Sequence, residues 1–195
     1  LYANNNHRRK FLNSVGEKIY KEWNAEKMEG WARVTFLGGG RQVGRSCLIL
    51  QTQNSKILLD CGLDVASSGA EKFPYFQVSE FNINELDAVV ITHAHLDHVG
   101  LLPYLYKMGY KGPTYMTFPS RDLAALMALD FIGVAYKQAA QPLFSSTDIK
   151  EMVKHTICLN FNEVTDIASD IRLTFYNAGH ALGSAMAHFN IGNER

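Results

Sequence analysis

The feature that most constrains this chain is a cluster of ligand-type side chains at the end of an apolar strand. Residues 88–92 read Ala-Val-Val-Ile-Thr, a β-branched run typical of a buried strand. The next six residues, His93 to His98, contain three of the seven histidines of the chain and one aspartate. A buried strand must therefore deliver these side chains to one edge of a sheet, where ligand sites usually lie.

The spacing inside this cluster is typical of a metal site with two ions. In an extended chain His93 and His95 project to the same side, so their imidazoles can share one ion. The chain then turns into a helix, so Asp97 and His98 leave in another direction and can reach a second ion. Imidazole and carboxylate together suit zinc. The alternative is a helix N-cap for Asp97 and a polar turn for the histidines, but such clusters seldom arise for packing alone.

Two residues elsewhere in the sequence are candidates for the same site. His180 follows a predicted strand, in a segment whose glycines allow close backbone approach. We interpret it as the third imidazole of the first ion, which leaves an open position for water; the alternative is a structural turn residue. Asp60 ends the apolar strand 56–60. It is predicted to orient the metal ligands through hydrogen bonds, with a turn carboxylate as the alternative.

The rest of the pattern predicts a layered α/β domain. Helices are expected over 7–23, 97–108, 121–140 and 145–154, and strands over 31–37, 46–51, 56–60, 88–92, 114–117, 156–159, 170–176 and 184–191. The core-facing side of the first helix is expected to carry Leu12, Val15, Ile19 and Trp23. That of the helix over 121–140 is expected to carry Leu123, Leu126, Met127, Phe131 and Val134. The polar residues 24–30 are expected to form a linker.

Charge, cysteine usage and hydropathy exclude several classes of protein. The formal net charge is zero, so the whole chain gives no electrostatic argument for nucleic-acid binding. The basic run Arg8, Arg9, Lys10 is either a solvated helix start or an RNA-facing patch. No apolar run approaches the roughly 20 residues that span a bilayer. The three cysteines show no paired spacing, which favours a cytoplasmic protein with reduced thiols. His188, in an apolar strand, is expected to be a buried core histidine.

Beyond these patterns, the sequence resembles a known family. The run 93–98 is similar to the signature of metallo-β-lactamase-fold hydrolases, whose fold is an αββα sandwich. The segments 36–47, 58–62 and 178–186 resemble the β-CASP branch, in particular the archaeal homologues of the cleavage and polyadenylation specificity factor nuclease subunit. The resemblance implies an incomplete metallo-β-lactamase-fold domain over 31–195, its N-terminal half only, with the β-CASP domain absent from this chain. Residues 1–30 would be a helix and linker from an upstream KH region.

The resemblance also implies an activity and a ligand set. It implies a zinc-dependent endoribonuclease that hydrolyses phosphodiesters with metal-activated water, in RNA 3′-end processing or transcription termination; some members also trim RNA from the 5′ end. Carried over residue by residue, one zinc ion is held by His93, His95 and His180. The second is held by Asp97 and His98, with Asp97 also orienting the water and Asp60 supporting the ligands.

Partners and departures follow from the same resemblance. The implied partners are single-stranded RNA and the transcription machinery, and a homodimer would form through regions absent from this chain. The family uses a further Asp after His180 to bridge two ions, and a distal His. No Asp occurs after Asp170, so we expect the 195-residue chain alone to be inactive.

Two other functions stay open. The first is another hydrolase on the same fold, of the thioesterase or lactamase type; the β-CASP-like segments oppose it. The second is a non-catalytic scaffold subunit, the fate of relatives that lose metal ligands; the intact ligand positions oppose it.

Overall fold

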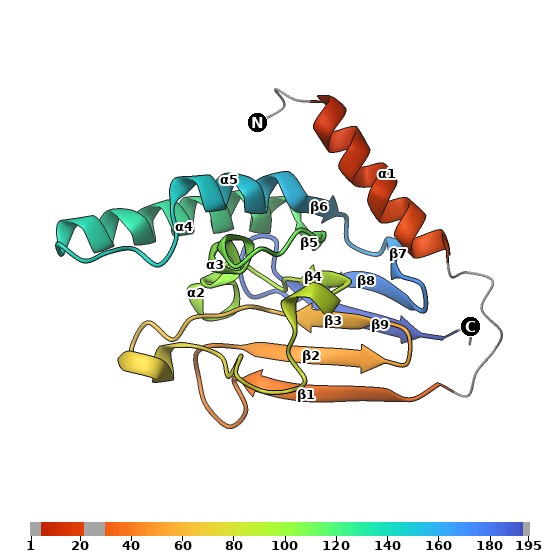
Figure 1. Cartoon of the computed structure of the whole chain (residues 1–195), viewed down its shortest axis with the longest axis horizontal. Helices are drawn as coiled ribbons and strands as arrows, with labels where there is room; N and C mark the ends of the chain where they lie inside the picture. The colour runs from red at the N-terminus through yellow and green to blue at the C-terminus, as the bar shows by residue number, and fades with distance from the viewer. Residues whose placement is uncertain (1–4, 22–29, 193–195) are drawn as a thin grey trace.

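The chain forms two stacked β-sheets, with helices α2 to α5 on the outer face of the larger sheet (Figure 1). The computed structural model describes residues 5–21 and 30–192. The larger sheet has the order β1-β2-β3-β4-β5-β6, with bounds β1 Ala32–Gly38, β2 Cys47–Thr52, β3 Lys56–Leu59, β4 Ala88–Val90, β5 Thr114–Thr117 and β6 Thr156–Leu159. The first three strands run antiparallel, whereas β3 to β6 are parallel.

Parallel pairing requires crossover connections. The β4–β5 crossover holds α2 (Leu96–Val99) and α3 (Leu102–Lys107), and the β5–β6 crossover holds α4 (Phe118–Lys137) and α5 (Ser146–His155). Two 3-10 turns, η1 (Gly69–Lys72) and η2 (Ile83–Glu85), lie between β3 and β4. The α5 helix begins with a capping box: the Ser145 side chain accepts from the Asp148 backbone N–H, and the Asp148 carboxylate accepts from the Ser145 backbone N–H.

The central strands are apolar on both faces because both faces are covered. Ile49, Leu58 and Val89 face the helices, whereas their neighbours Leu50 and Ile57 face the smaller sheet. This double burial explains why residues 88–91 read as an unbroken apolar run rather than as an alternating one.

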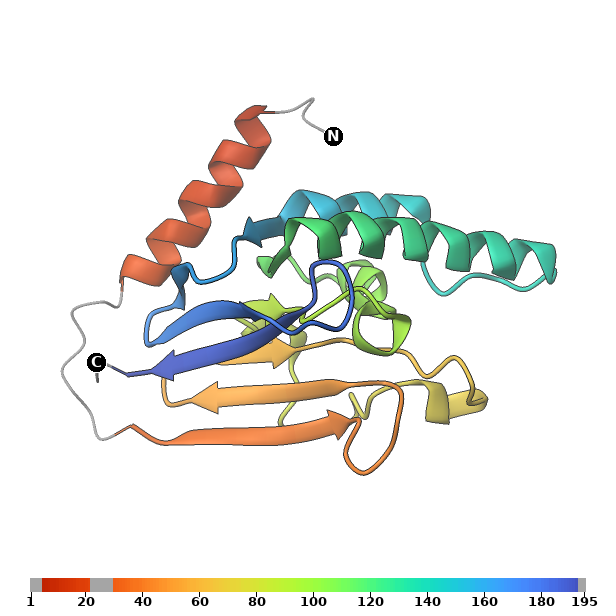
Figure 2. The same cartoon turned by 180° about the vertical axis from the view of Figure 1, so that it is seen from behind.

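The smaller sheet is an antiparallel meander of β7 (Val164–Ala168), β8 (Ile171–Asn177) and β9 (Ala185–Ile191). Figure 2 shows the molecule from the opposite side, where this smaller sheet lies in front of the larger sheet. The β8–β9 connection contains His180 and extends toward the helical layer (Figure 2). Strand β7 was not predicted from the sequence, because its five residues, of which only Ile167 and Ala168 are buried, carry little periodic signal.

The first helix, α1 (Asn5–Lys21), lies against the end of the sandwich near β6 and β7 (Figure 1). Its Arg8 guanidinium donates to the backbone carbonyls of Lys154 and Thr156, the latter at 2.7 Å. The face predicted from periodicity was wrong at Leu12, which is exposed; the inner face carries Phe11, Val15 and Ile19. Trp23 and the predicted linker, except residue 30, lie outside the described residues.

Two other predictions are corrected by tertiary structure. The helix expected over 97–108 is two helices, because after α2 the Leu101 N–H donates to the Cys61 carbonyl at 2.9 Å instead of continuing the helix. On α4, Leu126, Met127 and Val134 are exposed, and the buried face is formed by Ser120, Ala124, Ala128 and Ile132.

The three cysteines are free thiols. No helix in the described ranges is long and apolar enough to cross a membrane.

Candidate metal centre

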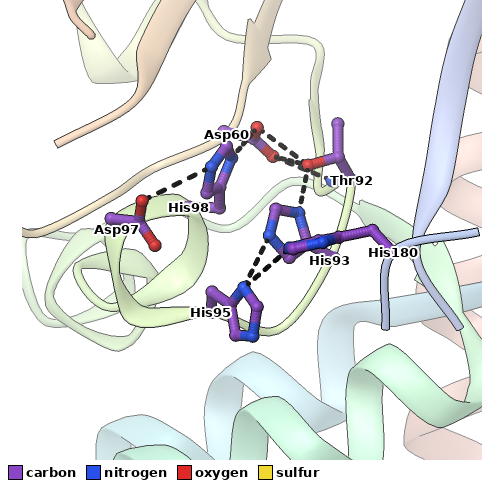
Figure 3. Close-up of polar contacts among 7 residues, drawn as sticks. All are labelled: Asp60, Thr92, His93, His95, Asp97, His98 and His180. Atoms are coloured by element: carbon purple, nitrogen blue, oxygen red, sulfur yellow. Dashed lines mark hydrogen bonds and ion pairs between the residues drawn. The ribbon is translucent and has the colours of Figure 1, made fainter. Parts of the chain in front are cut away.

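The residues singled out by sequence lie together at one edge of the sandwich (Figure 3). Asp60 directly follows β3, and Thr92 and His93 follow β4, which is parallel to β3. The two strands therefore end side by side, and their following residues meet. His180 reaches the same edge from the β8–β9 connection of the smaller sheet.

Three imidazoles converge on one point. The Nε2 atoms of His93 and His180 each lie 3.1 Å from Nδ1 of His95, and one ligand atom from each ring lies within 4.8 Å of the others. Two nitrogens bound to one tetrahedral zinc at about 2.0–2.1 Å are roughly 3.3–3.4 Å apart. The spacing of the three rings therefore fits a common divalent ion, with one coordination position left open.

A buried carboxylate lies behind these rings. Asp60 is 4% exposed and has a positive φ of 57°, a conformation that Asp tolerates better than most residues. Its oxygens accept from the Thr92 backbone N–H at 2.8 Å and from the Thr92 hydroxyl at 2.9 Å. They also accept from Nδ1 of His98 at 2.7 Å. Asp60 thus contacts the motif at two places without pointing at the three converging nitrogens.

This network fixes the tautomers of two histidines. The Thr92 hydroxyl donates to Asp60, so it can only accept from Nδ1 of His93, 3.0 Å away. With its proton on Nδ1, His93 presents the Nε2 lone pair to the converging site. His98 likewise uses its Nδ1 proton on Asp60, which leaves Nε2 facing Asp97 at 3.6 Å. Both rings are therefore oriented as metal ligands require.

The electrostatics of the two histidines differ. Burial is the main cause that lowers the pKa of His93 to about 4, and repulsion by the neighbouring His98, His95 and His180 rings contributes to the same shift. Burial also disfavours the charged form of His98. The hydrogen bond to Asp60 and the charges of Asp60 and Asp97 outweigh it, so the pKa of His98 is raised. In the ion-free site the neutral form of His93 is therefore strongly favoured.

The motif loop is held by backbone contacts that sequence reasoning missed. The Asp97 carbonyl accepts from the Ser46 N–H at 2.8 Å, and the His98 carbonyl accepts from the Cys61 N–H at 2.7 Å. A Cβ at Gly62 would overlap the Asp97 carbonyl, so glycine is needed at that position. The sequence signal was present in the glycines around 38–46 and 62, but only the fold reveals which backbone they approach.

The remaining histidines lie away from this centre. His188 is exposed on β9, contrary to the prediction of a core histidine; alternation places it on the outer face, opposite its neighbours Ala187 and Phe189. His155 ends α5, with Nδ1 2.8 Å from the Glu151 carbonyl. In the basic run on α1, Arg9 is exposed whereas Arg8 is half-buried.

Comparison with known proteins identifies the family of this chain. Residues 49–195 match the model of the metallo-beta-lactamase superfamily domain. The chain is 53% identical over 194 residues to transcription termination factor FttA of Methanothermobacter thermautotrophicus, covering 99% of this chain and 30% of that protein. It is 48% identical to FttA of Thermococcus kodakarensis, covering 99% and 31%. The chain thus spans about 30% of the length of these relatives.

Solved structures share the fold at low sequence identity. A metallo-beta-lactamase of Cronobacter sakazakii superposes with a TM-score of 0.56 at 18% identity, covering 88% of this chain and 61% of that one. A metallo-beta-lactamase of Elizabethkingia meningoseptica superposes with a TM-score of 0.53 at 21% identity, covering 90% and 60%. At such identities the likeness is one of fold.

Proposed function

Because the chain belongs to the metallo-beta-lactamase superfamily, a group of metal-dependent hydrolases, we propose that it is the metal-binding part of a zinc-dependent ribonuclease of the β-CASP branch. The observation that carries this proposal is the convergence of three imidazole nitrogens within 4.8 Å. The high identity to proteins named transcription termination factors supports the choice of nucleic acid over other substrates.

In this proposal the donor set divides between two ions. His93, His95 and His180 hold one zinc, and Asp97 and His98 contribute to a second. Asp60 contacts no ion and sets the orientation of His93, through Thr92, and of His98 directly. The 3.1 Å separations between ring nitrogens and the tautomers fixed by Asp60 support this assignment.

The proposed substrate is single-stranded RNA, cut during 3′-end processing or transcription termination in the cytoplasm together with the transcription machinery. When bound, zinc ions lower the pKa of water and stabilise the charge that develops at phosphorus. In this proposal Asp60 and Thr92 hold the histidine ligands in place, and Asp97 orients the attacking water. Endonucleolytic cleavage, 5′-end trimming and a homodimer belong to the same proposal and concern the longer polypeptides that this chain matches over about 30% of their length.

We further propose that the 195-residue chain by itself does not cleave RNA. Among the described residues, this proposal assigns two ligands to the second ion, Asp97 and His98, and two ligands hold an ion poorly. Catalysis on a phosphate also needs the substrate fixed near the ions, and the net charge of this chain is zero.

Zinc titration of the ion-free chain tests the metal site. Calorimetry should show one tight site, and His95→Ala should abolish it. His188→Ala, which removes an exposed histidine on β9, is the matched control and should bind as the wild type does. If the wild-type chain binds no zinc, or if both variants bind equally, the proposed site is wrong.

A cleavage assay tests the substrate class. A full-length polypeptide carrying this sequence should cut single-stranded RNA with zinc and lose that activity in His95→Ala. Hydrolysis of a β-lactam or a thioester instead of RNA would favour the alternative enzyme classes. Tight zinc binding without hydrolysis of any of them would favour a scaffold. Zinc-dependent RNA cleavage by the 195-residue chain, lost in His95→Ala, would contradict the proposed inactivity of the short form.

A further inference from the structure

The loop that carries His180 is exposed, yet it is fastened at one point by two buried hydroxyl groups. We propose that Thr117 and Ser120, at the start of α4, are positioning residues for the metal site. By binding the carbonyl of Gly183 they fix the β8–β9 connection so that His180 meets His93 and His95. This inference rests on the proposed metal site and adds to it residues from an element that supplies none of its ligands.

The fastening is a short, buried hydrogen-bond cluster. The Gly183 carbonyl oxygen accepts from the Thr117 hydroxyl at 2.7 Å and from the Ser120 hydroxyl at 3.0 Å. A carbonyl oxygen has two lone pairs, so both bonds can form together. Thr117 is 3% exposed and Ser120 is fully buried. These two hydrogen bonds hold the loop firmly, because breaking them would leave the buried Gly183 carbonyl without a hydrogen-bond partner.

The backbone conformation of Gly183 and its lack of a side chain both suit this contact. Its φ of 81° lies in the region that favours glycine. A Cβ there would lie 2.7 Å from the Thr117 hydroxyl oxygen and 2.9 Å from the Ser120 backbone nitrogen. The loop therefore approaches the start of α4 as closely as a backbone can, and Figure 2 shows the connection reaching toward that helix.

The loop has few other restraints. Residues 176–182 are all exposed, and burial resumes at Gly183. Ser184 organises the turn from within, accepting from the backbone N–H of Ala181 at 2.8 Å and of His180 at 3.3 Å. The next contact to the body is the Ala185 N–H, which donates to the Thr92 carbonyl at 2.9 Å. Thr117 and Ser120 therefore supply the side-chain part of the anchorage, and Thr92 supplies the backbone part.

Helix capping does not account for this arrangement. As the N-cap of α4, Thr117 uses only an oxygen lone pair, accepting from the Ser120 N–H. Its hydroxyl proton is not needed for capping and is directed to Gly183. The Ser120 hydroxyl has no capping role. Its proton is directed to the Gly183 carbonyl, and its oxygen lies 3.0 Å from the Thr117 hydroxyl oxygen. A second hydroxyl at this depth is thus explained by the loop and not by the helix.

The test compares zinc affinity and loop exchange in a set of variants of the 195-residue chain. The set contains Ser120→Ala, Thr117→Val and the double variant, with Thr117→Ser as the conservative change. Thr156→Val is the matched control: its hydroxyl is equally buried and donates to the Met152 carbonyl at 2.8 Å, away from the loop. Zinc affinity is measured by competition with a chelator, and amide hydrogen exchange of residues 178–185 is measured on the ion-free chain.

The double variant should lose about tenfold or more in zinc affinity, as other residues that support metal ligands do, and residues 178–185 should exchange faster. Ser120→Ala should show part of both effects. Thr117→Ser should keep wild-type affinity, and Thr156→Val should lower the melting temperature without changing affinity or loop exchange. Unchanged affinity in the double variant, or an equal loss in Thr156→Val, would overturn the inference. If the wild-type chain binds no zinc, the proposed function fails, and unchanged loop exchange would then overturn the anchorage separately.

Discussion

Among single residues, Asp60 has the widest influence on the site. Its two oxygens hold His98 directly and His93 through the Thr92 hydroxyl, so one carboxylate sets both tautomers. The sequence predicted that Asp60 orients the metal ligands, from its position at the end of an apolar strand. The part played by Thr92 could not be foreseen, since it depends on the positive φ that turns the Asp60 side chain toward β4.

Replacing Asp60 with Asn should loosen both rings. The amide has one acceptor oxygen where the carboxylate has two, so it cannot serve Thr92 and His98 equally, and its neutral charge removes the main support for protonated His98. The pKa of His98, followed by NMR, should fall, and zinc affinity should weaken by roughly 10- to 100-fold. Asp87→Asn, which changes a carboxylate bound to the Lys56 N–H at the opposite end of β3, is the control. Wild-type affinity in Asp60→Asn would contradict this role.

His93 should make the stability of the ion-free chain depend on pH. Its pKa is about 4 in the folded chain, against 6.5 as the reference value. Below pH 6.5 the unfolded chain therefore takes up a proton that the folded chain refuses, and the free energy of unfolding should fall as pH drops from 6.5 to 4. The loss is at most about 3 kcal/mol.

Urea unfolding with a chelator present, at several pH values, measures this slope. The raised pKa of His98 acts in the opposite sense, since its contribution is lost as pH rises. The informative quantity is therefore the difference between the wild type and His93→Gln, in which the fall should be smaller. His7→Gln, at an exposed position on α1, should keep the wild-type slope. Parallel curves for the wild type and His93→Gln would show that burial does not act as described.

Among the elements, every strand except β7 could be predicted from the sequence, whereas the helices could be predicted only in part. The apolar runs in residues 47–52, 56–59 and 88–90 define three strands, and the polar residues 53–55 mark the turn between the first two. By contrast α4 is apolar nearly all round, so its periodicity could not identify the buried face. The structure buries Ala124 and Ala128, whose small side chains let the helix approach the sheet closely, and exposes Leu126. The break between α2 and α3 depends on Cys61, far away in sequence.

The loop before β2 is held in place by the buried guanidinium group of Arg45. The Arg45 guanidinium donates to the Phe73 carbonyl at 3.0 Å, to Glu71 at 2.8 Å and to the Tyr75 hydroxyl at 3.0 Å. It also lies 4.6 Å from the centre of the Tyr75 ring. Arg45 therefore joins the glycine-rich loop to the segment around η1, and the Ser46 N–H beside it supports the Asp97 carbonyl.

Arg45→Met should destabilise the chain by about 2–3 kcal/mol, because it removes several charge-assisted hydrogen bonds at once. Arg45→Lys should recover little of this loss, since an ammonium group cannot reproduce the planar fork. Chemical denaturation gives the free energies. Arg33→Met is the control: its exposed side chain donates to Gln51 at 2.8 Å and lies 5.9 Å from the centre of the Trp31 ring, so its cost should stay within about 0.5 kcal/mol. Equal costs for the two methionine variants would refute the role of Arg45.

At the scale of the whole molecule, contacts near both ends of α1 hold this helix against the end of the sandwich. Arg8 binds two carbonyls where α5 passes into β6, and Lys18 forms an ion pair with Asp87 at 2.8 Å. Carbonyls at a helix C-terminus are natural partners for a cation. The Arg8 guanidinium is therefore used in contacts within the fold, so a basic surface on α1 would be formed by its neighbours Arg9 and Lys10.

Arg8→Ala should release this helix without unfolding the body. Hydrogen exchange of residues 5–21 should accelerate, whereas the strands of the larger sheet should keep their protection. The change in unfolding free energy should be on the order of 1 kcal/mol. Arg9→Ala removes an equal charge from the adjacent, exposed position and should leave the exchange of α1 unchanged. Identical exchange in the two variants would mean that α1 is held by its apolar face alone.

The separation of His180 from His95, 85 residues along the chain, has a consequence for how the molecule matures. During synthesis His93 and His95 emerge long before β8 and β9, so a nascent chain offers an ion only two imidazoles. The third arrives when the two sheets dock, a step that closes a long loop and is slow for that reason. An ion that binds three imidazoles better than two then favours the docked state by mass action. Metal supply would therefore act on the yield of folded protein as well as on the chemistry of the finished site.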